Sequence, residues 1–291
     1  LIRHYRNNPS IVMWCIGNEV PDQWNGNNGP KLSRMLQDIC HREDPTRPVT
    51  CGMDQVSCVL KNGFAAMIDV PGFNYRAHRY LEAYELLPQN IVLGSETSST
   101  VSSRGVYKFP VEKRGDVKYD DHQSSGYDLE HCSWSNVPDE DFALADDYDW
   151  TIGQFVWTGF DYLGESWGWP GRTNNYGIID LACFEKDHYY LYQSLWSDEP
   201  MVHVLPHWTH PGKEGVEIPV VVYTNGDAAE LFYNGKSLGR KDMHRDSLQI
   251  VWNVPYRPGT IKAVAYKDGR VIASCSHKTA GKAYSLKLTV D

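Results

Sequence analysis

Residues 11–19 read Ile-Val-Met-Trp-Cys-Ile-Gly-Asn-Glu, and this stretch indicates the fold. The run Ile11–Ile16 is apolar at every position, which is typical of a strand buried on both faces of a parallel sheet. Gly17 ends the run, and the polar residues Asn18 and Glu19 follow it directly. The stretch therefore predicts a parallel sheet with polar side chains at the carboxyl end of a strand.

More strands and helices alternate behind this first strand. Short apolar runs predict further strands at Val49–Cys51, Ala65–Val70, Ile91–Leu93 and Thr151–Trp157. Apolar stripes of helical period predict helices from Pro30, along Tyr80–Leu87, around Phe142–Tyr148 and at Asp187–Trp196. This alternation predicts an α/β fold with right-handed βα units. A closed (β/α)8 barrel has eight strands, whereas the residues indicate only about five.

The pattern changes after Glu199. Alternating strands now follow one another through tight turns, of which Asn234-Gly235 and Asp268-Gly269 are typical of two-residue hairpins. We therefore expect residues 1–198 to form the sheet-and-helix domain and residues 199–278 a β-sandwich. Residues 279–291 would be a linker and the start of any further module, because Tyr284–Val290 alternates like a strand.

Composition excludes several classes of protein. The net charge is −9 and no run of Lys and Arg occurs, so we expect no nucleic-acid partner. No stretch of about 18 apolar residues is present, so we expect no membrane-spanning helix. The seven cysteines include no Cys-x-x-Cys pair, which argues against a zinc site and against a disulfide framework. The many aromatic residues fit either a buried core or a cleft whose rings stack on sugars.

Two carboxylates follow predicted strands. Glu19 follows the first strand, and Glu96 follows Ile91–Leu93 after Gly94 and Ser95. Glycoside hydrolysis needs two carboxyl groups on opposite sides of one bond, and retention of configuration needs them about 5–5.5 Å apart. A single glutamate after a strand is more often a surface residue. Two of them, at the edge where such sheets keep their chemistry, favour a hydrolytic site.

Several segments carry a resemblance to a known family. Arg6–Glu19 (RNNPSIVMWCIGNE) resembles the signature of glycoside hydrolase family 2, which holds β-galactosidases, β-glucuronidases and β-mannosidases. Gly94–Thr97 resembles the nucleophile strand of that family, and Gln154–Tyr162 its eighth barrel strand. Two further stretches, Val220–Tyr223 and Ala229–Lys236, resemble parts of a module that follows the barrel. The resemblance implies barrel strands four to eight and an immunoglobulin-like β-sandwich, with the N-terminal part of the family's chain missing.

The resemblance also implies roles for individual residues. Glu19 would be the acid/base and Glu96 the nucleophile. Further candidates for substrate binding are Asn18, Asn74, Tyr75, Trp157 and Asp161. Asn18 would bind the sugar 2-hydroxyl, and Tyr75 would hydrogen-bond Glu96, although a core Tyr is the alternative. Trp157 would be the sugar platform or a core residue, and Asp161 would bind a hydroxyl or form a structural salt bridge.

Specificity is indicated by Asn174-Asn175-Tyr176-Gly177. Glucuronidases of the family have Asn-x-Lys before Gly, and their Lys pairs with the substrate carboxylate. Tyr176 stands in that place here, which favours a neutral hexose and makes a β-galactoside or an oligosaccharide the expected substrate. β-Glucuronidase, β-mannosidase and an inactive carbohydrate-binding protein remain alternatives. Arg172 is the nearest residue in sequence that could replace the missing charge.

Other features are less informative. No cofactor or metal ligand set is identified, and any magnesium ligands would belong to the part that the resemblance implies to be missing. A homo-oligomer is compatible with the sequence, and periplasmic, secreted and cytoplasmic locations all stay open. We expect the loop Ser98–Asp139 to lie over the cleft, with Trp134 and Tyr127 either contacting the leaving group or packing the loop on itself. His203, His207 and His210 are expected at the surface.

Overall fold

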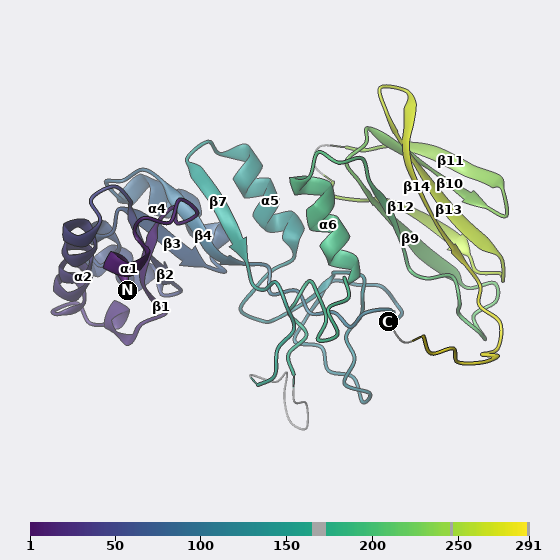
Figure 1. Cartoon of the computed structure of the whole chain (residues 1–291), viewed down its shortest axis with the longest axis horizontal. Coiled ribbons are helices and arrows are strands. Elements are labelled where there is room, and N and C mark those ends of the chain that lie inside the picture. The colour runs from purple at the N-terminus through teal and green to yellow at the C-terminus, as the bar shows by residue number, and fades with distance from the viewer. Residues whose placement is uncertain (165–172, 245–246, 290–291) are drawn as a thin grey trace. The chain divides into compact units, whose positions relative to one another are not determined.

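The computed structural model describes residues 1–164, 173–244 and 247–289 (Figure 1). The chain forms two compact units. The first unit comprises Leu1–Val101, Arg114–Val117 and Glu130–Gly159, and the second comprises Ser102–Lys113, Lys118–Leu129 and Phe160–Asp291. This division differs from the expected boundary at residue 198, because residues 160–198 belong with the strands that follow them. The domain limits given above stay a prediction.

A five-stranded parallel sheet forms the centre of the first unit. Its strands lie in the order of the chain and are β1 (Trp14–Asn18), β2 (Val49–Met53), β3 (Val70–Asn74), β4 (Val92–Thr97) and β7 (Thr151–Val156). The predicted α/β fold is confirmed. Two strand positions were wrong: β1 begins at Trp14 rather than Ile11, and Ala65–Met67 is a 3-10 turn (η2) that precedes β3. A short apolar run cannot by itself distinguish a strand from a buried helical turn.

Helices connect these strands. They are α1 (Ile2–Tyr5), α2 (Gly29–Glu43), α3 (Val56–Asn62), α4 (Tyr80–Leu86) and α5 (Pro138–Asp147), with 3-10 turns η1 (Pro21–Trp24) and η3 (Ala77–Arg79). The sequence did not indicate α3, which ends at Gly63 in the left-handed conformation typical of a helix end. Buried side chains from sheet and helices, including Met53, Val59, Phe73 and Val92, form one core. This core holds the strands, and therefore their carboxyl ends, in place.

Two antiparallel sheets dominate the second unit. One has the order β11 (Lys236–Asp242), β10 (Ala228–Tyr233), β13 (Thr260–Lys267), β14 (Arg270–Lys278), and the other β12 (Ile250–Pro255), β9 (Glu217–Thr224), β8 (Val202–Leu205). Side chains from both sheets share one core. Asn234-Gly235 and Asp268-Gly269 are two-residue hairpin turns with positive φ at both residues, as predicted.

The remaining elements include one helix and one small sheet. Helix α6 (Asp187–Trp196) has the bounds predicted for it. Within the loop expected over Ser98–Asp139, β5 (Arg114–Gly115) pairs with β6 (Glu130–His131). The strand predicted from Tyr284 was wrong for the described residues 284–289, which form no regular structure and have exposed side chains. Within the described chain no strand pairs with this segment, and an isolated strand leaves its backbone groups without partners.

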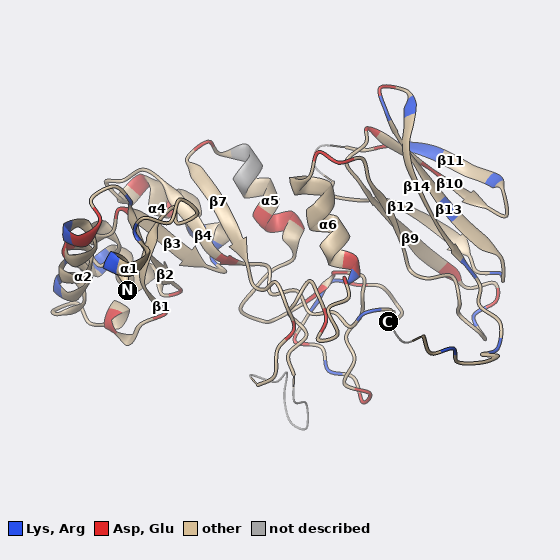
Figure 2. Cartoon of the chain, in the orientation of Figure 1, with Lys and Arg blue, Asp and Glu red and all other residues tan. Residues whose placement is uncertain are grey.

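Positively charged side chains lie on one edge strand of the second unit. Figure 2 shows Lys and Arg gathered on β11, the edge strand of its sheet, where Lys236, Arg240 and Lys241 are exposed. Cations on an edge strand oppose pairing with a second sheet, because the charges repel and must keep their water.

Among the described residues, no helix is both long enough and apolar enough to cross a membrane.

Candidate active site

Four candidate residues lie at the carboxyl ends of two strands of the first unit. Asn18 and Asn74 are the last residues of β1 and β3, and Glu19 and Tyr75 come directly after them. Glu19 and Tyr75 both have positive φ, 46° and 55°, which is uncommon for residues with a side chain. Such conformations cost about 1–3 kcal/mol each and cluster at functional sites.

Backbone hydrogen bonds hold both of these residues in that conformation. The amide of Glu19 donates to the carbonyl of Gly52 at 2.9 Å, and the amide of Tyr75 donates to the carbonyl of Glu96 at 2.8 Å. Each residue that leaves its strand is therefore still bonded to the neighbouring strand.

Asn74 connects the two strand ends. Its side-chain amide donates to Glu19 Oε1 at 2.9 Å and to Asn18 Oδ1 at 3.0 Å, and its Oδ1 accepts a hydrogen bond from Ser95 Oγ at 2.7 Å. Asn74 is fully buried, so these contacts account for its polar atoms away from solvent. The structure therefore shows Asn74 positioning the Glu19 carboxylate, a contact that the sequence did not reveal. Binding of substrate by Asn74 stays a prediction.

Tyr75 holds the second carboxylate. Its hydroxyl donates to Glu96 Oε2 at 2.6 Å, so the hydrogen bond predicted between these residues is present. Burial raises the pKa of Glu96, and the nearby Glu19 carboxylate raises it further, whereas the hydrogen bond from Tyr75 lowers it. Burial and the contact with Glu96 raise the pKa of Tyr75 far above its usual range. Tyr75 therefore keeps its proton and donates a hydrogen bond to Glu96.

Glycines in the strands give these polar side chains their space. A Cβ on Gly52 would lie 2.2 Å from Asn18 Oδ1 and 3.0 Å from Asn74 Oδ1, so no side chain fits there. A Cβ on Gly72 would similarly lie 2.8 Å from Ser95 Oγ. Sequence analysis did not single out these glycines, although a glycine inside a buried strand often marks the close approach of other groups.

Trp157 lies at the end of the neighbouring strand. It follows the last residue of β7, and its backbone amide donates to the carbonyl of Thr97 at 3.0 Å. Thr97 ends β4, the strand that carries Glu96. Trp157 is therefore attached beside the end of the strand that carries Glu96 and is partly exposed, and its use as a sugar platform stays a prediction.

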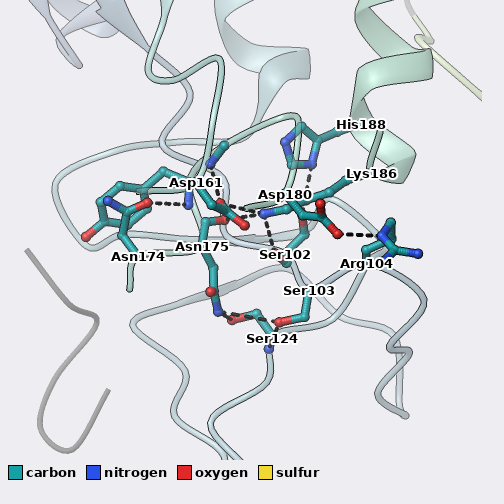
Figure 3. Close-up of polar contacts among 12 residues, drawn as sticks. Ser102, Ser103, Arg104, Ser124, Asp161, Asn174, Asn175, Asp180, Lys186 and His188 are labelled. Atoms are coloured by element: carbon teal, nitrogen blue, oxygen red, sulfur yellow. Dashed lines mark hydrogen bonds and ion pairs between the residues drawn. The ribbon is translucent and has the colours of Figure 1, made fainter. Parts of the chain in front are cut away.

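Asp161 belongs to the second unit and forms the structural salt bridge that was one of its two expected roles. Figure 3 shows Asp161 beside Lys186, whose Nζ donates to Asp161 Oδ1 at 2.7 Å. Gly177 N donates to the same oxygen at 2.9 Å, and Lys186 also donates to the carbonyl of Ser102 at 2.8 Å. Burial opposes both charges, so it lowers the pKa of Lys186 and raises that of Asp161. Hydroxyl binding by Asp161 stays a prediction.

The segment Asn174–Gly177, on which the expected specificity rests, belongs to the same unit. Tyr176 and Asn174 are buried, and the backbone amide of Tyr176 donates to Asn174 Oδ1 at 3.4 Å. Asn175 is drawn in Figure 3 with its amide directed at Ser103 and Ser124, to which it donates at 3.4 and 3.5 Å. Arg172, the residue that could replace the missing cation, lies outside the described residues.

The histidines near the start of the antiparallel sheets are not all at the surface, which corrects the sequence prediction. His210 is buried, and burial lowers its pKa to about 4. The ring of His203 stacks on Tyr190 with centroids 3.9 Å apart and contacts Asp187 Oδ1 at 2.7 Å. Packing against aromatic rings, rather than exposure to solvent, accounts for the positions of His203 and His210. Within the described part of the chain, no group of three or more His, Cys, Asp or Glu residues is arranged to hold a metal ion.

The two aromatic candidates of the long loop differ in exposure. Tyr127 is buried in the second unit against Leu191 and Leu205, and its hydroxyl donates to the carbonyl of Pro219 at 2.8 Å. Packing, one of the two alternatives, is thus what the structure shows for Tyr127. Trp134 belongs to the first unit, is 45% exposed and lines a cavity that Tyr75 also lines.

Comparison with known proteins identifies the family. Residues 1–122 match a family model described as the TIM barrel domain of glycosyl hydrolases family 2, and residues 215–273 match a domain of unknown function, DUF4982. The β-galactosidase BoGH2A of Bacteroides ovatus is 36% identical over 98% of this chain. This chain belongs to glycoside hydrolase family 2. A putative β-glucuronidase of Formosa agariphila is also similar to this family 2 chain, at 33% identity over 98% of it.

The family 2 chain is shorter than these relatives. It spans 38% of the length of the B. ovatus protein and 29% of the F. agariphila protein. The crystal structure of a β-glycosidase from Bacteroides vulgatus is similar with a TM-score of 0.80 and 36% identity, covering 96% of this chain and 38% of that one. The names of the relatives agree on a β-glycosidase and differ on the sugar that is removed.

Proposed function

We propose that this chain carries both catalytic carboxylates of a retaining β-glycosidase, with Glu96 as the nucleophile and Glu19 as the acid/base. The observation that supports this most is the hydrogen-bonded set at two strand ends, in which Asn74 contacts Glu19 and Tyr75 contacts Glu96. A protein that only binds sugar needs neither carboxylate, which argues against an inactive carbohydrate-binding protein.

The proposed chemistry has two steps. In the first, Glu96 attacks the anomeric carbon and Glu19 gives its proton to the leaving oxygen, which yields a glycosyl ester on Glu96. In the second, Glu19 takes a proton from water, whose oxygen attacks the anomeric carbon and releases Glu96 as a carboxylate. Asn74 donates to Glu19 Oε1, which leaves Oε2 to carry the transferred proton. Asn18 would bind the 2-hydroxyl of the sugar, a contact that strengthens in the transition state.

We propose further that the sugar is a neutral hexose, with a terminal β-galactoside as substrate. The support is Tyr176, which stands where glucuronidases of the family place a lysine. A glucuronide carboxylate bound without a cation loses its water without gaining a charge partner, which costs several kcal/mol. The 36% identity to a β-galactosidase agrees with this choice, whereas the 33% identity to a putative β-glucuronidase supports the alternative.

The test is a panel of aryl β-glycosides of galactose, glucuronic acid and mannose, hydrolysed by the complete protein. We expect kcat/KM for the galactoside to exceed that for the glucuronide by at least roughly a hundredfold. Glu96→Gln is the control and should abolish turnover, since an amide cannot form the glycosyl ester. Equal values would mean that another residue supplies the charge, and Arg172→Ala would then be the next variant. No turnover of any glycoside would favour the carbohydrate-binding alternative.

The same proposal extends to the architecture. We propose that β1, β2, β3, β4 and β7 correspond to strands four to eight of a (β/α)8 barrel and that the two antiparallel sheets form an immunoglobulin-like sandwich. The match of residues 1–122 to a TIM barrel model and the parallel order of the sheet support the first part. An experimental structure of the complete protein tests it, and three further strands pairing beside β1 are the expected result.

A further inference from the structure

A cavity of about 600 Å³ opens in the first unit, and Tyr75, which contacts the candidate nucleophile, is one of its lining residues. Its floor comes from the residues that follow β3, beginning with Tyr75, and one wall comes from residues 133–136 of the long loop. Glu140 and Leu144 of α5 supply the other wall. The volume falls within the range of about 300–1,000 Å³ that small-molecule sites occupy. Because Tyr75 also holds Glu96, the cavity begins next to the proposed reaction centre.

Hydrogen bonds hold the loop wall in place. The amide of Ser99 donates to Ser135 Oγ at 2.8 Å, and the amide of Cys132 donates to the carbonyl of Ser99 at 3.1 Å. Within the loop, the amide of Ser135 donates to the carbonyl of Cys132 at 3.0 Å, so Trp134 is a central residue of a tight turn. These bonds hold the turn against Ser99, which follows Glu96 closely in the chain.

Arg76 joins the floor to this wall. One of its terminal nitrogens, Nη1, donates to the carbonyl of Tyr75 and to the carbonyl of Trp134, both at 3.0 Å. The guanidinium therefore fixes the position of the Trp134 backbone relative to the residue that holds the nucleophile. A fixed turn holds the Trp134 backbone in place, so binding to its side chain, which is 45% exposed, costs little further backbone entropy.

The lining has the chemistry of a sugar site. An exposed indole offers an apolar face on which the C–H face of a pyranose can stack. Arg76, His78, Asn136 and Glu140 surround it with charged and amide groups that can bond hydroxyls. The presence of both Arg76 and Glu140 argues against selection for a single sign of charge. A hydroxyl-rich neutral ring fits this mixture better than an anion or an apolar aglycone does.

We propose that this cavity is the leaving-group subsite, with Trp134 as its stacking platform, and that the natural substrate is therefore a β-linked oligosaccharide or glycan chain. The inference rests on the proposed glycosidase function and adds the class of the leaving group. Arg76 is a positioning residue for Trp134.

The test compares two substrates that carry the same galactosyl group and differ in the leaving group, of which only one is large enough to fill the cavity. β-Galactosyl fluoride leaves the cavity empty, whereas lactose places a second sugar in it. In the complete protein, Trp134→Ala should lower kcat/KM for lactose by about tenfold and leave kcat/KM for the fluoride within about twofold. Trp196→Ala is the matched control, since Trp196 is 57% exposed and does not line the cavity.

A second readout does not depend on how much of the variant folds. With the fluoride as donor and cellobiose as acceptor, the glycosyl ester on Glu96 is divided between water and the acceptor hydroxyl, whose proton goes to Glu19. Both products arise from one intermediate, so their ratio reports on the cavity alone. Trp134→Ala should lower the ratio of transfer to hydrolysis by about tenfold.

The possible outcomes separate this inference from the function on which it rests. If wild-type protein hydrolyses the fluoride and Trp134→Ala changes neither the lactose value nor the transfer ratio, the subsite is refuted and the glycosidase stands. If the variant loses both substrates equally with an unchanged transfer ratio, Trp134 is structural and the subsite is again refuted. If wild-type protein hydrolyses neither the fluoride nor the aryl panel, both proposals are wrong.

Discussion

Replacing Tyr75 by Phe removes one hydroxyl and should shift the pH dependence of the enzyme. The hydroxyl donates to Glu96 Oε2 at 2.6 Å and lowers the pKa of that carboxyl. Hydrogen bonds to charged groups contribute about 1.5–3 kcal/mol. Since Glu96 is only half-buried, we take a value below this range, about 1.4 kcal/mol, which corresponds to about one pKa unit.

The sign of the shift follows from the role of the nucleophile. As the proposed nucleophile, Glu96 must be ionised to attack, so activity should fall as pH drops through its pKa. Without the hydrogen bond the pKa of Glu96 rises, and the acidic limb of the kcat/KM profile should move to higher pH by about one unit. The assay is kcat/KM for the best aryl glycoside across the pH range, measured on the complete protein.

A matched control is available in the same unit. Tyr80 is also buried, and its hydroxyl makes no hydrogen bond within the described residues. Tyr80→Phe should leave the acidic limb unmoved and should not lower Tm, because it removes a buried polar group that has no partner. An unmoved limb in Tyr75→Phe, or an equal shift in both variants, would refute the claim that Tyr75 controls the ionisation of Glu96.

Other changes test the rest of the site. Gly52→Ala should lower kcat/KM by at least about tenfold while the protein still folds, because the new Cβ takes the place of Asn18 Oδ1; wild-type kinetics would show that Asn18 is not needed where it lies. Glu19→Ala should still form the glycosyl ester from aryl glycosides with good leaving groups, and azide should restore turnover and give a β-glycosyl azide. Undiminished hydrolysis of glycosides with poor leaving groups would exclude Glu19 as the acid. Lys186→Met leaves the Asp161 carboxylate buried without its cation and should lower the free energy of unfolding by about 3–5 kcal/mol, measured by urea denaturation. A loss below about 1 kcal/mol would mean that Asp161 becomes solvated or protonated in the variant.

Local patterns in the sequence predicted much of the fold, because short-range chemistry decides those elements. Helix α6 has the bounds that its apolar stripe predicted, and Asn234-Gly235 forms the turn that only residues tolerant of positive φ can form. Ala65–Met67 was misassigned as a strand because periodicity is ambiguous over so few residues. The β3 strand then begins later and ends at Asn74, which places Tyr75 just beyond it.

The contacts of the site were harder to predict, because they join residues far apart in the chain. The family signature pointed to Glu19 and Glu96, but nothing near Asn74 in sequence indicated that its amide would contact Glu19. The same holds for Lys186, a single lysine whose partner Asp161 lies in another loop. Pairings of this kind follow from strand order and register, which local patterns do not contain.

The positive φ values of Glu19 and Tyr75 have a common explanation in strand geometry. Consecutive side chains of a regular strand point to opposite faces, so Asn18 and Glu19 could not both reach one group if β1 simply continued. They do both contact the amide of Asn74, and the register of β1 with β2 is irregular just before them, between Cys15 and Asn18. At the end of β3, Asn74 reaches Glu19 while its successor Tyr75 reaches Glu96, again beside a break in register. Irregularities of this kind are common next to active sites. The left-handed residues thus turn two neighbouring side chains toward one site, and the strain that they carry, about 1–3 kcal/mol each, is offset by ladder hydrogen bonds to Gly52 and Glu96.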